Sequence, residues 1–130
     1  MATFLLDTNV IIDAINEKKN RNLSLLDLAE QGHTLACCPI NVAEVYAGLR
    51  PKEEQRTAAL LHSLQLYPIT FPVAELAGRL KRDYSRKGKT LTTPDTIIAA
   101  VALHYRLTFI TDNTKDFPMV DLSFYSLPED

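Results

Sequence analysis

The 130-residue chain lacks tryptophan, has only two cysteines and contains no long apolar run. A membrane-spanning helix needs roughly 18 or more consecutive apolar residues, and no stretch of the sequence reaches that length. The first residues include neither the basic nor the apolar segment of a secretory signal peptide. We therefore expect a cytoplasmic protein that does not enter the membrane.

The two cysteines, Cys37 and Cys38, are adjacent. They lack the C-x-x-C spacing of a zinc site, and we interpret both as small apolar residues of a strand. The sequence also lacks an excess of one charge, because its formal net charge is −2. No global basic field therefore indicates nucleic-acid binding, although a local basic patch is compatible with it.

Short apolar runs alternate with amphipathic stretches along the whole chain. The patterns predict strands at residues 4–6, 34–38, 66–69, 107–111 and 122–127, the third and last at sheet edges. They predict helices at residues 10–17, 23–31, 41–49, 52–64, 73–87 and from 92–95 through 103. Strands that alternate with helices indicate an α/β fold with a mainly parallel sheet and helices on both faces. The length is that of one domain.

Several residues are predicted to begin or end these helices. Asn22 and Asn41 are predicted N-caps, and Glu44 stands three residues after Asn41, at the spacing of a capping box. Gly32 is expected to end the helix at 23–31, whose apolar face would include Leu26.

Carboxylates recur where the chain leaves a predicted strand or enters a predicted helix. Asp7 follows the first strand, Glu44 and Asp95 lie in first turns of helices, and Asp112 and Asp116 follow the strand at 107–111. The carboxyl ends of parallel strands and the helix starts that follow them share one edge of the sheet. We therefore expect acids that are far apart in sequence to meet at this edge.

Carboxylates that meet without a basic partner repel one another, so they raise a pKa or require a cation. Hard oxygen ligands favour Mg²⁺ or Mn²⁺, and such an ion supports in-line displacement at phosphorus. The pattern thus indicates metal-dependent phosphodiester hydrolysis. Each acid also has an ordinary alternative: Asp7 as a turn residue, Glu44 as a capping acid, Asp95 as an acid favoured by the helix dipole, and Asp116 as a loop charge.

Other conspicuous side chains have simpler interpretations. His33, His62 and His104 show no ligand spacing and are interpreted as structural or surface residues. A basic stripe on the helix at 73–87 and just beyond it is either a solvated face or a phosphate-binding surface; its members are Arg79, Arg82, Arg86, Lys87 and Lys89. Tyr46 and Leu49 share a helix face that either packs in the core or binds a partner.

Four stretches taken together resemble the PIN-domain family, specifically the VapC-type toxins of toxin–antitoxin pairs. They are Leu5–Ile11 (LLDTNVI), Val42–Leu49 (VAEVYAGL), Pro94–Ala100 (PDTIIAA) and Ile110–Phe117 (ITDNTKDF). The resemblance implies a single PIN domain over residues 1–130, a three-layer α/β/α sandwich around a mainly parallel sheet. It implies a Mg²⁺- or Mn²⁺-dependent ribonuclease acting on single-stranded segments of structured RNA. It also implies homodimerisation and inhibition by a cognate antitoxin.

By motif, the first three acids of the family match Asp7, Glu44 and Asp95. The fourth is less direct, because Asn113 and Asp116 take the positions that the family fills with polar or acidic residues, and Asp112 falls on a variable position. We favour Asp116 with Asn113 assisting, and Asp112 stays open. An amide at position 113 makes occupancy by a single metal an option.

The hypothesis gives these side chains separate roles. Asp7, Asp95 and Asp116 hold the metal directly or through water, and Glu44 orients or deprotonates the attacking water. The residues expected to hydrogen-bond and orient the acids are Thr8, Asn9, Thr111 and Asn113. The resemblance implies that water displaces the 3′ oxygen and leaves a 5′ phosphate. The basic stripe would contact RNA, and Tyr46 and Leu49 would contact the antitoxin.

Two other functions are compatible with parts of the pattern. One is a flavodoxin-like phosphotransfer domain, although a single acid follows the first strand and Asn9 stands where an Asp-x-Asp motif needs its second acid. The other is a catalytically silent PIN scaffold that binds RNA or a partner. The acids at 7, 44 and 95 argue against a silent scaffold.

Overall fold

Five parallel strands form the centre of the protein, whose computed structural model describes residues 1–129. The central strand β1 (Thr3–Leu6) pairs with β2 (Thr34–Cys37) and β4 (Thr108–Ile110), and the edge strands are β3 (Gln65–Leu66) and β5 (Ser123–Phe124). The order is β3-β2-β1-β4-β5. The predicted parallel sheet and its two edge strands are confirmed. The order differs from the 2-1-3-4-5 of flavodoxin-like folds, so that alternative is set aside.

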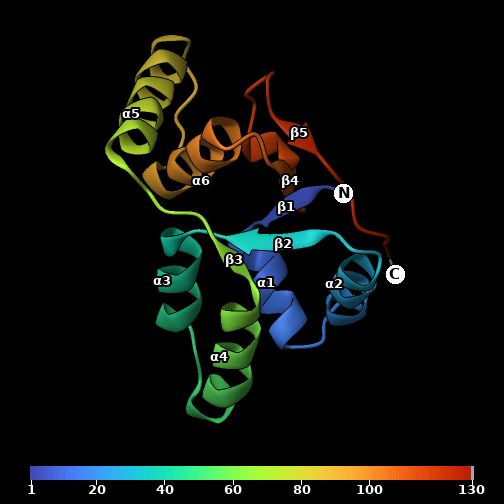
Figure 1. Ribbon diagram of the computed structural model, residues 1–130. Coiled ribbons are helices and arrows are strands. Elements are labelled where there is room, and N and C mark those ends of the chain that lie inside the picture. Colours follow the sequence, from blue (N-terminus) through green and yellow to red (C-terminus); the bar gives the residue numbers. More distant parts are fainter. Residues whose placement is uncertain (130) are drawn as a thin grey trace.

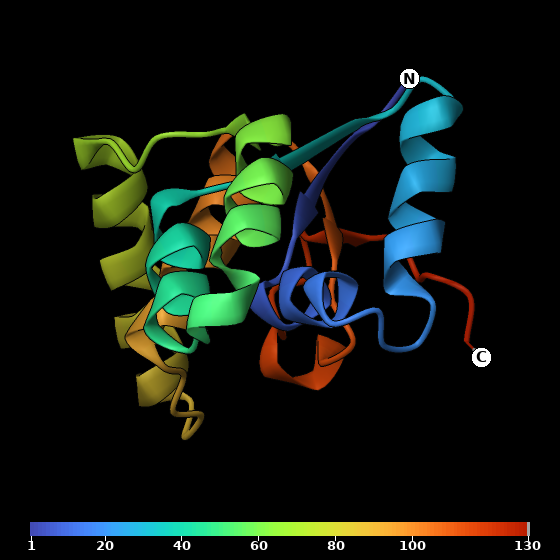
Figure 2. The ribbon, with the colours of Figure 1, turned by 90° about the horizontal axis from the view of Figure 1, so that it is seen from below.

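Helices cover both faces of the sheet, as predicted (Figure 1). They are α1 (Thr8–Ile15), α2 (Arg21–Glu30), α3 (Pro39–Ala47), α4 (Glu54–Ser63), α5 (Phe71–Arg86) and α6 (Thr93–His104). Short 3₁₀ turns occupy Pro51–Glu53 and Thr114–Asp116. Helices α5 and α6 lie on one face and α1 to α4 on the other, which Figure 2 shows in front of the strands. The three-layer α/β/α sandwich is therefore confirmed.

Alternate residues of the strands build two cores, one on each face. Leu5 and Phe109 pack with α5 and α6, whereas Phe4, Leu6 and Ile110 pack with α1, α2 and α4. Each such side chain, once fully buried, contributes about 1.5–3 kcal/mol. A slip of one residue in β1 would exchange its two faces, so this alternation holds the register that presents Asp7 at the strand end.

Cys37 and Cys38 are both buried and free. They enter opposite cores, Cys37 on the α1 side and Cys38 on the α6 side. The prediction that they are small apolar residues is confirmed, although the strand itself ends at Cys37.

The predicted N-caps of two helices are wrong. Helix α2 begins at Arg21, with Asn20 rather than Asn22 as its N-cap, and its Leu26 is 54% exposed instead of buried. Helix α3 begins at Pro39, a residue suited to the first helical turn, so Cys38 is the N-cap and Asn41 lies within the helix. Glu44 is therefore not a capping acid.

Other local predictions are confirmed. Gly32 ends α2 with a φ of +94°, a conformation that side chains with a Cβ rarely adopt. Thr92 caps α6, because its hydroxyl accepts the Asp95 N–H at 3.2 Å. Within residues 1–129, no helix has both the length and the apolar character needed to cross a bilayer.

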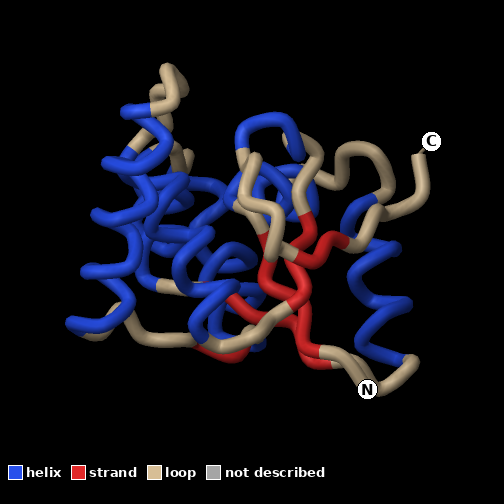
Figure 3. Tube along the Cα trace, turned by 90° about the horizontal axis from the view of Figure 1, so that it is seen from above, coloured by secondary structure: helices blue, strands red, loops and turns tan. Residues whose placement is uncertain are grey.

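A backbone hydrogen bond continues the pairing of β1 and β4 one residue past the end of β1. The Asp7 N–H donates to the Ile110 carbonyl at 2.9 Å. Figure 3 shows the strands running side by side through the middle of the molecule, with loops and helix starts beyond their ends. Asp7 and Thr111 therefore leave the sheet next to each other.

Candidate acidic active site

Asp7 sits at the N-terminus of α1 with both carboxylate oxygens engaged. Its Oδ1 accepts the Thr8 N–H at 2.8 Å, and its Oδ2 accepts the Thr111 hydroxyl at 2.7 Å. The side chain is buried, with the residue only 7% exposed. A carboxylate has about four acceptor positions, so the two bonds set its rotamer and leave lone pairs for a further ligand.

Glu44 is tied to the same place through the Thr8 hydroxyl. Thr8 Oγ1 donates to Glu44 Oε1 at 2.6 Å and accepts from Asn41 Nδ2 at 3.0 Å. The Cys38 N–H in turn donates to Asn41 Oδ1 at 2.8 Å. A chain of hydrogen bonds thus runs from the start of α3 to Thr8, beside Asp7.

Sequence reasoning treated Asn41 only as an N-cap and missed its link to Thr8. Asn41 is fully buried, and its amide joins α3 to α1. A buried amide needs partners for its polar atoms, and both of its ends find one here. The available signal was a polar residue three positions before Glu44, on the side of the helix that faces the sheet.

Asp95 and Asp116 complete the set of acids. Asp95 is half-buried in the first turn of α6, and Asp116 is exposed in the 3₁₀ turn that follows β4. Burial raises the pKa of Asp7, and the negative charges of Asp95 and Glu44 raise it further, against the hydrogen bonds from Thr111 and Thr8. Burial likewise raises the pKa of Asp95, with Asp116 and Glu44 adding to the rise and Thr92 opposing it. These contributions link Asp7 with Asp95 and Glu44, and Asp95 with Asp116 and Glu44, which is consistent with the predicted grouping of the four acids.

These four acids have no cationic partner in the part of the chain that the structure describes. None of them forms an ion pair with a Lys, Arg or His among residues 1–129. In the same range, no three carboxylate, thiol or imidazole side chains are close enough to ligate one ion directly. Magnesium commonly keeps several waters and binds one or two carboxylates. The oxygen-only set therefore fits a hydrated divalent ion rather than a closed protein cage.

Asp112 points to a different partner. Its Oδ1 accepts from Arg21 Nη2 at 2.7 Å, and Lys19 Nζ lies 3.9 Å from its Oδ2. Of the two candidates for the fourth acid, Asp116 interacts with Asp95 and Asp112 is neutralised by Arg21. The arrangement favours Asp116.

The predicted supporting residues divide into two groups. Thr8 and Thr111 hydrogen-bond the acids, and Asn113 contributes its backbone N–H, which donates to Thr111 Oγ1 at 3.0 Å. Asn9 is exposed in the first turn of α1, and its side chain hydrogen-bonds no carboxylate within residues 1–129. Its predicted supporting role is not seen here.

The basic stripe is exposed, and its last member lies next to the acids. Arg79 pairs with Glu75 and Arg82 with Asp83, both on the surface of α5. Lys87 Nζ lies 5.1 Å from the ring centre of Tyr84, and Arg86 is exposed. Lys89 Nζ donates to the carbonyl of Lys115 at 3.3 Å. Lys89 therefore lies beside the turn that carries Asp116.

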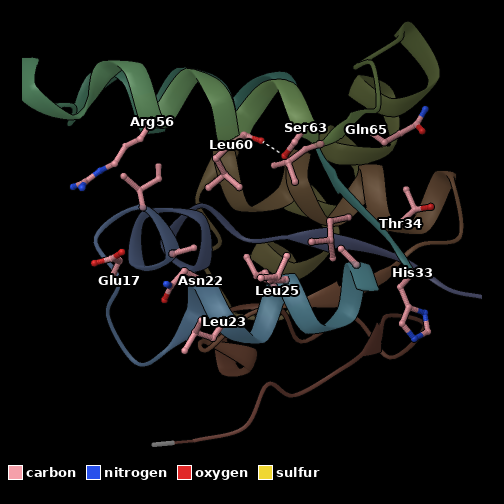
Figure 4. A pocket seen from close by; sticks show the side chains of 16 residues that line it. Glu17, Asn22, Leu23, Leu25, His33, Thr34, Arg56, Leu60, Ser63 and Gln65 are labelled. Carbon is pink, nitrogen blue, oxygen red and sulfur yellow. Dashed lines mark hydrogen bonds between the residues drawn. The ribbon is translucent and has the colours of Figure 1, made fainter. Parts of the chain in front are cut away.

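The predicted partner-binding residues lie on α3 and just after it. Tyr46 is 39% exposed, and Leu49 is partly buried beside a small cleft that Ile12 and Val45 also line. A much larger apolar groove of about 890 Å³ runs between α2 and α4 (Figure 4). Leu23 and Leu26 of α2 line it while 58% and 54% exposed. Sequence reasoning missed this groove because it assigned Leu26 to the core.

Comparison with known proteins gives consistent matches. The family model described as PIN domain matches residues 4–121. Ribonuclease VapC2 of Rickettsia felis is 28% identical over 122 residues, which cover 90% of this chain and 91% of that protein. The crystal structure of VapBC2 from Rickettsia felis bound to a promoter DNA fragment superposes with a TM-score of 0.82 at 25% identity, covering 97% and 99% of the two chains. A toxin–antitoxin complex from Klebsiella pneumoniae gives a TM-score of 0.73 at 31% identity, covering 93% of each chain.

Proposed function

Because this chain belongs to the PIN-domain family, we propose that it is a metal-dependent endoribonuclease, a VapC-type toxin that a cognate antitoxin neutralises. The observation that carries the proposal is the meeting of Asp7, Glu44, Asp95 and Asp116 at one edge of the sheet without a cation within residues 1–129. The relative named a ribonuclease and the relatives solved as toxin–antitoxin complexes support it.

Asp7, Asp95 and Asp116 would hold Mg²⁺ or Mn²⁺, at least one of them through water. Hard carboxylate oxygens suit these ions. Burial, and after it the neighbouring carboxylates, raise the pKa values of Asp7 and Asp95, and a bound cation would offset both effects. When bound, such an ion polarises the phosphate and makes water a stronger nucleophile.

The chain's own side chains would position the attacking water. Glu44 is exposed and has one oxygen held by Thr8, so its other oxygen is free to accept a proton from a water aligned with the phosphorus. Asp7 is held at both oxygens and cannot turn away from the site. Asn113 has a neutral side-chain amide rather than a carboxylate, which is consistent with a site that binds a single metal ion.

RNA would approach along the basic end of α5. Lys89 reaches the turn that carries Asp116, and Arg86 and Lys87 stand exposed just before it. Arg79 and Arg82 lie farther along the same helix, each beside an acid. Phosphate contacts of this kind position a nucleic acid without reading its sequence, so cleavage should weaken as the salt concentration rises.

The antitoxin would place an apolar segment in the groove between α2 and α4. The groove has the apolar lining that an amphipathic helix requires, with Leu23 and Leu26 exposed along one wall and Arg56 at its rim (Figure 4). Tyr46 and Leu49 lie outside it, on the α3 side, and remain a second contact candidate. The homodimer that the family resemblance implies belongs to the same proposal.

The test is cleavage of labelled single-stranded RNA with Mg²⁺, with EDTA, and with EDTA followed by excess Mg²⁺. We expect cleavage, its loss, and its recovery. Asp95→Asn should abolish cleavage, whereas the matched exposed acid variant Asp121→Asn should retain it. Folded wild-type protein that cleaves equally in EDTA would contradict the metal requirement. Folded protein that binds RNA without cleaving it would instead favour the silent scaffold.

A further inference from the structure

Arg21 is a buried cation that no part of the proposed chemistry uses. It is the first residue of α2 and only 3% exposed. Its Nη2 donates to Asp112 Oδ1 at 2.7 Å, and its Nη1 donates to the carbonyl of Pro128 at 2.8 Å. One side chain thus joins the start of α2 to the loop after β4 and to the last described residues, which run beside α2 in Figure 1.

Local structure around Arg21 is unfavourable in three ways. Glu17 and Lys19 just before it adopt φ values of +55° and +54°, a region that is costly for most residues with a Cβ. A cation at the first position of a helix opposes the helix dipole. A buried charge loses its hydration. None of these features helps α2 to form, so the reason for this arrangement must lie in the contacts of Arg21.

Stability alone does not supply that reason. A buried ion pair commonly contributes little to stability compared with apolar residues of the same size. What a planar guanidinium does well is to bind two acceptors in a set geometry. Here those acceptors belong to segments 91 and 107 residues away in the chain. The contact therefore specifies where the loop after β4 lies.

That loop carries two residues of the acidic site. Thr111, next to Asp112, donates to Asp7, and the turn Thr114–Asp116 presents Asp116 near Asp95. We propose that Arg21 is a positioning residue, which holds Asp112 outward and thereby fixes residues 111–116 in the geometry that the acids need. Asp112 is then the anchor of this loop rather than a member of the acidic set. The inference rests on the proposed ribonuclease function for its effect on cleavage.

The test compares Arg21→Gln with Arg50→Gln, a control that breaks the Arg50–Glu53 ion pair, in which no residue of the loop takes part. Two quantities are measured: hydrogen exchange of residues 111–117 in metal-free protein, and kcat and KM for RNA cleavage. Arg21→Gln should accelerate exchange in this segment at least ~tenfold and lower kcat about tenfold with little change in KM. Arg50→Gln should lower the thermal midpoint without either effect.

Asp112→Asn gives a second route to the same result if Arg21→Gln fails to fold. Its side chain is 30% exposed, and an amide oxygen still accepts from Arg21, so we expect the same changes at smaller size. Unchanged exchange in 111–117, or accelerated exchange with unchanged kcat, in a folded variant would overturn the proposal. If the wild type shows no metal-dependent cleavage, the ribonuclease proposal fails, while the exchange measurement still decides whether Arg21 holds the loop.

Discussion

Asp7 and Glu53 are both buried carboxylates, but their surroundings shift their pKa values in opposite directions. Glu53 accepts from Arg50 Nη2 at 3.1 Å and from the Arg50 N–H at 3.1 Å, and Arg56 lies 3.7 Å away. Hydrogen bonds and charge from Arg50 lower the pKa of Glu53. Asp7 instead lies near Asp95 and Glu44, and its pKa is raised.

The difference separates a carboxylate that serves the fold from one that serves a site. Glu53 finds its cation within the chain, so its charge is compensated when the protein folds. Asp7 has hydrogen bonds that orient it but no cation among the described residues. Uncompensated charge on a partly buried carboxylate is typical of functional sites. Glu53 should therefore matter for stability, and Asp7 for activity.

The largest effect is expected for Asp7→Asn. Cleavage should fall by at least ~100-fold, the upper end of the loss for a residue that only supports a metal ligand. The thermal midpoint in metal-free buffer should stay level or rise, because the amide removes repulsion with Asp95 and Glu44 while its oxygen still accepts the Thr8 N–H. Mg²⁺ should raise the midpoint of the wild type and not of the variant. A folded variant with wild-type cleavage would remove Asp7 from the site.

Thr8→Val tests the hydrogen bonds that hold Glu44. The change keeps the side-chain shape and the backbone bond to Asp7 but removes the hydroxyl between Asn41 and Glu44. We expect cleavage to fall about tenfold and the free energy of unfolding to fall by about 1 kcal/mol.

Thr57→Val is the matched control for Thr8→Val. Thr57 is also fully buried, but its hydroxyl has no hydrogen-bond partner within residues 1–129. Removing an unpartnered buried hydroxyl should leave stability level or higher and cleavage unchanged. Equal effects of the two substitutions would show that the Thr8 hydroxyl does not position Glu44.

Glu53→Gln should show the opposite profile to Asp7→Asn. The thermal midpoint should fall, because an amide nitrogen would face the Arg50 and Arg56 donors, while cleavage should remain within about twofold of the wild type, as expected for independent sites. Because folding lowers the pKa of Glu53 from 4.5, its stabilisation is present above pH 4.5 and is lost as the pH falls through the folded value. The difference in thermal midpoint between wild type and variant should therefore become smaller below pH 4.5.

The smallest effect concerns the thiols of Cys37 and Cys38, which are buried and free. Burial raises the pKa of Cys37 to about 11 and also raises that of Cys38. Since the thiolate is the reactive form, both should react with a disulfide reagent at pH 8 only as fast as the protein unfolds. The reaction is measured by the absorbance of the released reagent. Rapid labelling of the native protein would contradict this expectation.

The sequence by itself determined the layered α/β fold and where Asp7 and Asp95 would stand. Each of these conclusions rests on a local signal: the period of an apolar pattern, a strand that stops at an acid, or a hydroxyl before a helix. Local rules succeed here because neighbouring residues alone decide the outcome.

The family resemblance favoured Asp116 over Asp112 but left Asp112 open, and only the tertiary structure separates the two. Asp112 forms an ion pair with Arg21, whereas Asp116 lies near Asp95. The inward turn of Asn41 and the exposure of Leu26 along a groove were decided in the same way. The physical reason is that each of these outcomes depends on residues dozens of positions away. Such long-range contacts produce no periodic pattern in the sequence from which they could be predicted.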